Sequence, residues 1–121
     1  MPWQLKNDRQ IWLQLAQILT QRIVSGQYAP GVRMPSVRDL AAEAGVNPNT
    51  MQRALVYLEE RGLVSAQRNT GRYVTQDAQL ISNTRHALAQ EELTLFCEKM
   101  RLLGFTPEET SQLLKSKGES E

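Results

Sequence analysis

The hydrophobic positions along the chain recur mainly at helical spacing, and the pattern is clearest between Pro35 and Arg61. Apolar residues three and four positions apart predict two short helices in this stretch, separated by a break at Gly45. The apolar residues that we expect to face inward are Val37, Leu40, Ala41, Ala44, Met51, Ala54, Leu55 and Leu58. Two short helices that cross through such a turn form a helix-turn-helix.

The ends of both predicted helices carry residues that suit helix termini. Ser36 can accept a hydrogen bond from the backbone N–H of Asp39, and Asn47 can cap the second helix, where Pro48 fits the first turn. Gly45 accepts the left-handed conformation that ends a helix. The second helix leaves three polar side chains outward near its N-terminus, those of Asn49, Gln52 and Arg53. In a helix-turn-helix, side chains at this place meet base edges in the major groove.

One further helix is predicted before this pair, and a hairpin after it. Apolar residues over 11–23 recur at helical spacing. After Gly62, alternating apolar and polar residues predict strands over 63–67 and 72–75, with a reversal at 68–71. Three helices followed by a two-stranded hairpin make a winged helix, so the expected fold is mainly α with a small β-hairpin.

The C-terminal third returns to a long helical pattern from Ala78 to Leu103. Its apolar stripe, which predicts a dimerisation surface, comprises Ile81, Leu88, Leu95 and Leu102 at intervals of seven, widened by Phe96. After a break at Gly104, Thr106 and Glu109 form a capping box that starts a short final helix. The predicted organisation is an N-terminal arm (1–9), a winged domain (10–76), a two-helix dimerisation region (77–116) and a frayed tail (117–121).

Composition and charge narrow the classes of function. The chain has 121 residues, 40% hydrophobic and 22% charged, as expected for one globular domain. It has no apolar run long enough for a membrane span, and its N-terminus lacks a signal peptide, so we expect a cytoplasmic protein without a membrane partner. The net charge is only +1, but the stretch from Arg33 to Arg72 contains six arginines and only four carboxylates. That part is the expected surface for DNA.

The sequence shows no arrangement typical of an enzyme or a metal site. It contains no phosphate-binding loop, dinucleotide fingerprint or nucleophile-base motif. His86 and Cys97 are single residues of their kinds, and zinc sites generally need three or four protein ligands. We therefore predict no catalytic residue, no metal and no cofactor.

Several segments together resemble the GntR family of bacterial transcription regulators. They are the pattern P-G-x-x-x-P-S-x-R-x-L-A at 30–41, Ala54-Leu55 with Leu58, Gly62-Leu63-Val64 and Gly71-Arg72-Tyr73-Val74. The resemblance covers residues 10–75. The short C-terminal part and the phrase Asn47-Pro48-Asn49-Thr50 resemble the YtrA subgroup. The resemblance implies a homodimer that binds a palindromic operator in double-stranded DNA, most often as a repressor.

The resemblance also implies which residues contact DNA. The family's contacts fall on Arg38, on positions 47–53 and on the wing tip around Gly71. The predicted DNA-binding residues are Ser36, Arg38, Asn47, Asn49, Thr50, Gln52, Arg53, Arg68, Thr70, Gly71 and Arg72. Relatives often carry arginine where this chain has Pro48 and Gln52. Arg53 would then contact guanine, and Gln52 would contact adenine.

Some of these residues have explanations that need no DNA. Asn47 can act only as a cap, and the Thr50 hydroxyl can bond within its own first turn. Arg38 is different, because a cation in the first turn of a helix is electrostatically misplaced unless an anion compensates it. A phosphate of DNA would supply that anion.

Two other functions fit the same fold. Near-neutral net charge is compatible with a winged helix that binds another protein instead of DNA. A small-molecule sensor is the third alternative, but few residues follow the wing, and a ligand pocket usually needs ~300–1,000 Å³. An unknown small-molecule effector would therefore sit between subunits.

Overall fold

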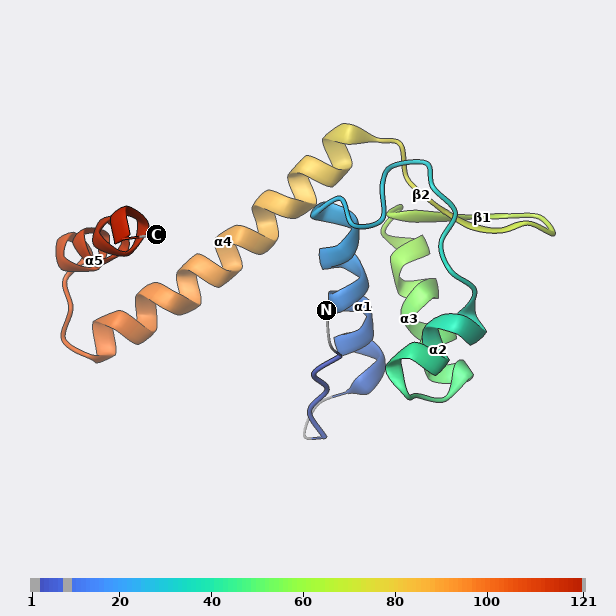
Figure 1. Ribbon diagram of the computed structural model, residues 1–121, viewed down its shortest axis with the longest axis horizontal. Coiled ribbons are helices and arrows are strands. Elements are labelled where there is room, and N and C mark those ends of the chain that lie inside the picture. Colours follow the sequence, from blue (N-terminus) through green and yellow to red (C-terminus); the bar gives the residue numbers. More distant parts are fainter. Residues whose placement is uncertain (1–2, 8–9, 121) are drawn as a thin grey trace. The chain divides into compact units, whose positions relative to one another are not determined.

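The computed structural model describes residues 3–7 and 10–120. In chain order the elements are α1 (Ile11–Val24), α2 (Val37–Ala44), α3 (Pro48–Glu60), β1 (Val64–Gln67), β2 (Gly71–Val74), α4 (Ala78–Leu102) and α5 (Pro107–Ser120). The chain divides into two compact units, Met1–Arg85 and His86–Glu121 (Figure 1). Helix α4 begins in the first unit and ends in the second. The mainly helical fold with one hairpin agrees with the prediction.

Helices α1, α2 and α3 enclose the core of the first unit, and the hairpin extends from the end of α3 as a narrow ribbon (Figure 1). The largest fully buried side chains are Leu15, Leu19, Ile23, Leu40, Met51, Leu55, Leu58 and Leu63. The predicted inward faces of α2 and α3 are confirmed. Of the residues assigned to them, only Val37 and Ala44 are half-buried, and both pack against the core.

The turn between α2 and α3 has the geometry that its residues predict. Ser36 Oγ accepts a hydrogen bond from Asp39 N at 3.1 Å, and Asn47 Oδ1 accepts one from Asn49 N at 2.7 Å. Gly45 ends α2 with φ 71° and ψ 36°, a conformation that favours glycine. These caps fix the direction in which α3 leaves the turn, and with it the side chains that α3 exposes.

The wing has two faces of different character. Strands β1 and β2 are antiparallel, with Val64 opposite Val74 and Ser65 opposite Tyr73. Val64 and Val74 are buried on the inner face, whereas Ser65 lies on the outer face and is exposed. The segment 31–34 runs along the free edge of β2, where Arg33 forms an antiparallel bridge with Tyr73. This segment therefore holds β2 on the edge that does not pair with β1.

The N-terminal arm is anchored on the first unit through a buried arginine. Arg22 is 3% exposed, and its guanidinium lies 4.4 Å from the centre of the Trp3 ring. Glu43 joins the two, because its Oε2 accepts hydrogen bonds from Trp3 Nε1 at 2.8 Å and from Arg22 Nη1 at 2.9 Å. The hydrogen bond from Arg22 lowers the pKa of Glu43. Through these contacts Trp3 anchors the N-terminal arm on the first unit.

This cluster predicts an acid-sensitive contribution to stability. Because the folded-state pKa of Glu43 lies below its unfolded value of about 4.3, the contribution is complete above that pH and is lost as pH falls through the folded value. Glu43→Gln is expected to cost less than about 1 kcal/mol at pH 7, since the Glu43 side chain is 49% exposed. Urea unfolding at pH 7 and in acid measures the difference. Glu60→Gln, at an exposed carboxylate of α3, is the control. A pH-independent cost of Glu43→Gln would contradict this account.

The second unit contains few buried residues. Over residues 86–119 only Thr110 is buried, and no residue of the described helix α4 is. The capping box before α5 is present, with Thr106 N donating to Glu109 Oε1 at 2.9 Å and Glu109 N donating to Thr106 Oγ1 at 3.1 Å. Residues 117–120, which the sequence predicts to be a frayed tail, continue α5. α5 continues through Gly118, which has no positive φ, and Lys117 suits the last turn of the helix.

Candidate nucleic-acid interface

The N-terminal half of α3 presents the polar face that the sequence predicts. Asn47, Asn49 and Gln52 are exposed, and Thr50 is half-buried. The side chains of Asn49 and Gln52 form no hydrogen bond or ion pair with the described part of the chain. Asn47 uses its side-chain oxygen as the cap, which leaves its amide NH₂ group free to donate. This end of α3 therefore offers donors and acceptors to an external polar partner.

Arg53 is held toward α1. Its guanidinium lies 4.3 Å from the centre of the Trp12 ring, and Trp12 meets Tyr57 edge-on at 5.5 Å. Arg61 stacks on the other aromatic residue, 4.3 Å from the centre of the Tyr57 ring. The Trp12 Nε1–H is buried without an acceptor among the described residues. Arg53, which is predicted to contact guanine, is therefore stacked on Trp12 of α1.

Arg38 has the surroundings expected of a phosphate-binding residue. It lies in the first turn of α2, directly after Ser36 and Val37, and is exposed. It forms no hydrogen bond or ion pair within residues 3–7 and 10–120. The partial positive charge of the helix N-terminus adds to that of its guanidinium, so the site favours an anion. The Ser36 hydroxyl accepts from Asp39 N and retains its own proton for donation.

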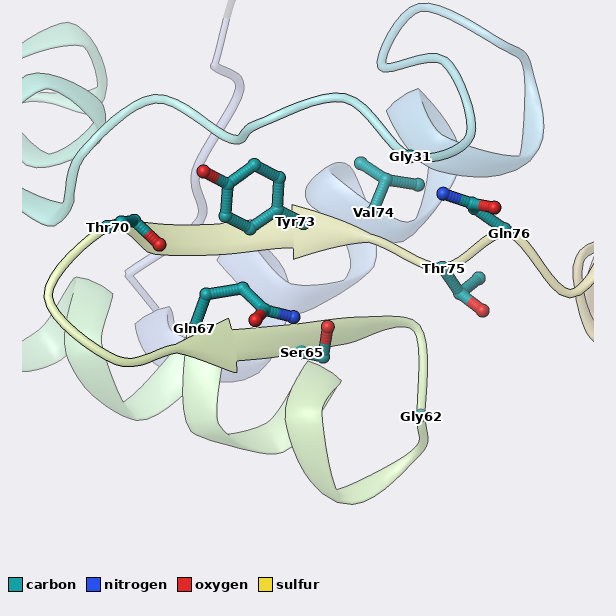
Figure 2. A pocket seen from close by; sticks show the side chains of 9 residues that line it. All are labelled: Gly31, Gly62, Ser65, Gln67, Thr70, Tyr73, Val74, Thr75 and Gln76. Atoms are coloured by element: carbon teal, nitrogen blue, oxygen red, sulfur yellow. The ribbon is translucent and has the colours of Figure 1, made fainter.

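The wing tip exposes Arg68 and Thr70, and its reversal depends on residues in left-handed conformations. Asn69 has φ 65° and Gly71 has φ 109°. A polar hollow of about 450 Å³ lies over the outer face of the wing, and Figure 2 shows the side chains that line it. It is lined by Gly31, Gly62, Ser65, Gln67, Thr70, Tyr73, Val74, Thr75 and Gln76. The hollow presents hydroxyl and amide groups next to the tip.

Arg72 follows Gly71 near the tip, but its side chain pairs with α3. Its Nε pairs with Glu59 Oε1 of α3, and both side chains are largely shielded from solvent, with exposures of 17% and 28%. The charge of Arg72 is therefore balanced within the molecule. Sequence reasoning gave its identity but not its direction, because Glu59 and Arg72 belong to different elements.

A cation that the sequence analysis did not single out lies on the wing. Arg33 is exposed, follows the turn at Pro30 and Gly31, and reaches the wing through its bridge to Tyr73. The sequence signal is weak: Val32, Arg33 and Met34 alternate apolar and polar residues after the turn, which permits an extended segment. Of the six arginines from Arg33 to Arg72, three remain without a hydrogen bond, ion pair or ring contact in the described structure: Arg33, Arg38 and Arg68.

The residues predicted for dimerisation differ in their surroundings. Ile81 packs against the core of its own unit, and Leu88 is half-buried. Leu95 is 57% exposed, Phe96 38% and Leu102 71%. A groove of about 820 Å³ lies between α4 and α5, with an apolar lining that includes Leu93, Phe105, Pro107 and Leu114. The second unit thus leaves a broad apolar surface uncovered within one chain.

Neither a metal-binding cluster nor a membrane-spanning helix is found among residues 3–7 and 10–120. Within those ranges, His, Cys, Asp and Glu side chains do not gather in a group of three or more that could hold a metal ion. His86 and Cys97 are both exposed on α4. No helix of the described chain has the length and apolar character to cross a membrane.

Comparison with known proteins gives consistent results. The family model described as bacterial regulatory proteins, gntR family, matches residues 12–74. The chain is 34% identical over 113 residues to the HTH-type transcriptional regulator YhcF of Bacillus subtilis, covering 93% of each chain. It is 29% identical over 98 residues to the HTH-type transcriptional repressor YtrA of the same species, covering 81% of this chain and 71% of YtrA. A solved structure, that of a GntR family transcriptional regulator from Listeria monocytogenes, has a TM-score of 0.86 at 32% identity, covering 93% of this chain and 98% of the other.

Proposed function

The chain belongs to the gntR family of bacterial regulatory proteins, transcriptional regulators with a DNA-binding domain, and we propose that it acts in the cytoplasm as a homodimeric repressor of a palindromic operator. The observation that carries the proposal is the distribution of charge on the first unit. Arg38 in the first turn of α2 and Arg68 on the wing are two of the three arginines from Arg33 to Arg72 that have no partner within the described residues, and their elements precede and follow α3 in the chain. Base edges would meet Asn49 and Gln52 between them.

The second unit supports association of two copies. A helical hairpin with a single buried residue over 86–119 cannot form a core of its own, so its apolar side chains need a partner. The exposed large apolar residues of this unit are Leu93, Leu95, Phe96, Leu102, Leu103, Leu113 and Leu114. Exposed large apolar side chains that gather in a patch are typical of an interface between proteins. A second copy of the same unit would cover it with an identical surface in a two-fold arrangement.

Symmetry and family together support the form of the operator and the sign of regulation. A two-fold dimer presents two copies of α3, so its operator would be an inverted repeat with half-sites one helical turn apart, ~34–36 Å. Repression is supported by the similarity to YtrA, which is named as a transcriptional repressor. A bound dimer at a promoter would block access of other proteins to the same DNA.

Binding to DNA from the promoter of its own gene neighbourhood tests the proposal. Fluorescence anisotropy with the promoter duplex and with a scrambled duplex, each at several salt concentrations, gives both specificity and the number of phosphate contacts. We expect preference for the promoter duplex and a steep fall of affinity with salt for both. Equal affinity for the two duplexes at every salt concentration would contradict sequence-specific regulation. Capture of a defined protein partner, without retention on DNA at low salt, would favour the protein-binding alternative.

Arg53 gives a prediction about specificity. Arg53→Ala is expected to relax discrimination at one base position of each half-site, by ~1–3 kcal/mol, and to change binding to scrambled DNA little. Arg53→Lys should relax it as well, because lysine lacks the planar group that stacks on Trp12 and pairs with guanine. Affinities for operators with single base replacements measure the effect. An equal loss of affinity on every duplex would instead make Arg53 a backbone contact.

A further inference from the structure

The wing holds its arginines in contrasting surroundings. Arg72 projects from the inner side of β2 and pairs with Glu59 of α3. Arg33 comes from the segment before α2 and forms an antiparallel bridge with Tyr73. Residues opposite each other in such a bridge carry their side chains on the same face. Arg33 therefore lies on the outer face together with Tyr73 and Ser65. Figure 2 shows Tyr73 and Ser65 beside the polar hollow on this face.

Gly71 makes room for the Arg33 side chain. A Cβ atom at Gly71 would lie 3.1 Å from Arg33 Nε and 3.4 Å from Arg33 Nη2. The first distance is tighter than ordinary van der Waals contact, so a side chain here would have to displace the guanidinium. Gly71 begins β2 at the tip end of the hairpin. Arg33 therefore extends along the outer face of the wing toward the tip.

The two arginines differ in the charge that they offer to a partner. Glu59 neutralises Arg72, and the pair is largely shielded from solvent. Arg33 is exposed and forms no hydrogen bond or ion pair with any described residue. Together with Arg68 at the tip, it gives the wing two guanidinium groups without a partner among the described residues, and these attract an anion.

We infer that Arg33 binds a DNA phosphate beside the wing, and that Arg72 ties the wing to α3 without contacting phosphate. The inference rests on the proposed function. It says that the group bound beside the wing is a phosphate of the DNA backbone, and that one arginine from the linker before α2 binds it. Guanidinium groups suit this role because they donate to two phosphate oxygens at once. Gly71 has a second purpose on this account, since it keeps the path of Arg33 open.

Salt-dependent binding to the promoter and scrambled duplexes tests the inference. Arg33→Gln is expected to weaken binding to both duplexes on the order of tenfold and to reduce the slope of log affinity against log salt by about 0.9 for each bound subunit. Arg33→Lys should keep the wild-type slope, because a lysine still neutralises one phosphate. The double variant Glu59→Gln/Arg72→Gln leaves net charge unchanged and should also keep that slope.

Arg61→Gln is the matched control for loss of one arginine, because Arg61 lies at the C-terminal end of α3 and stacks on Tyr57. It should leave the slope unchanged. A wild-type slope in Arg33→Gln, or an equal reduction in the Glu59→Gln/Arg72→Gln variant, would overturn the inference while leaving the proposed function intact. Failure of the wild-type protein to bind either duplex at low salt would instead overturn the proposed function and the inference with it.

Discussion

Replacing Leu95 and Leu102 together by glutamate is expected to leave the protein monomeric at micromolar concentration, where the proposed homodimer would form, and to lower its affinity for the operator at least 100-fold. Leu95 is 57% exposed and Leu102 is 71% exposed within one chain, so the change costs a monomer little. Glutamate also keeps the helix, since its helix propensity is close to that of leucine. The cost falls on the interface, where four carboxylates would lose their water.

The loss of operator affinity follows from the loss of one half-site. A dimer binds both half-sites in one event, whereas a monomer must bind each of them separately. Leu95→Met with Leu102→Met is the control, because methionine keeps the volume and the apolar character of both positions. Light scattering reports the mass, and anisotropy with the operator duplex reports the affinity. A monomeric wild-type protein, or a dimeric glutamate variant, would contradict the assignment of this surface.

The second large effect is expected at Arg38. Arg38→Gln should lower affinity for operator and scrambled DNA alike by at least about 100-fold, because hydrogen bonds to charged groups contribute ~1.5–3 kcal/mol and a dimer would lose two of them. The slope of log affinity against log salt should fall by about 0.9 for each subunit. The fold should be unaffected, since Arg38 is exposed and has no hydrogen bond or ion pair with the described residues.

Salt titrations with both duplexes measure the Arg38 effect. Arg61→Gln again removes one arginine, at the C-terminal end of α3 rather than in the first turn of α2, and should leave affinity and slope near those of the wild type. A loss confined to the operator duplex would make Arg38 a base-reading residue. An unchanged slope would mean that Arg38 contacts no phosphate. The lack of a partner among the described residues would then not identify the arginines that bind DNA.

The local features of the fold could be predicted from sequence because each depends on neighbouring residues. The caps at Ser36 and Asn47 join residues two or three positions apart, and the box at Thr106 does the same. Gly45 and the apolar faces of α2 and α3 follow from residue type and helical period. Such signals need no knowledge of what the chain packs against.

The partners of Arg72, Glu43 and Arg33 could not be predicted, because they come from other elements. Arg72 meets Glu59 across 13 positions of the sequence, and Trp3 meets Glu43 across 40. Arg33 reaches the wing only because its segment runs along the edge of β2. Sequence patterns therefore identify the arginines that DNA could attract, but only the folded chain separates those that are free from those already paired.

Selection of binding sites from a random pool of duplex DNA tests the central claim most directly, since it asks about sequence specificity and two-fold symmetry at once. Repeated enrichment on the wild-type protein, followed by sequencing, is predicted to yield an inverted repeat whose half-sites lie about 10–10.5 base pairs apart, centre to centre. The glutamate variant of Leu95 and Leu102 should enrich single half-sites at most. A pool without any enriched motif, or a single unrepeated motif bound by the wild-type protein, would contradict a dimer that reads DNA through two copies of α3.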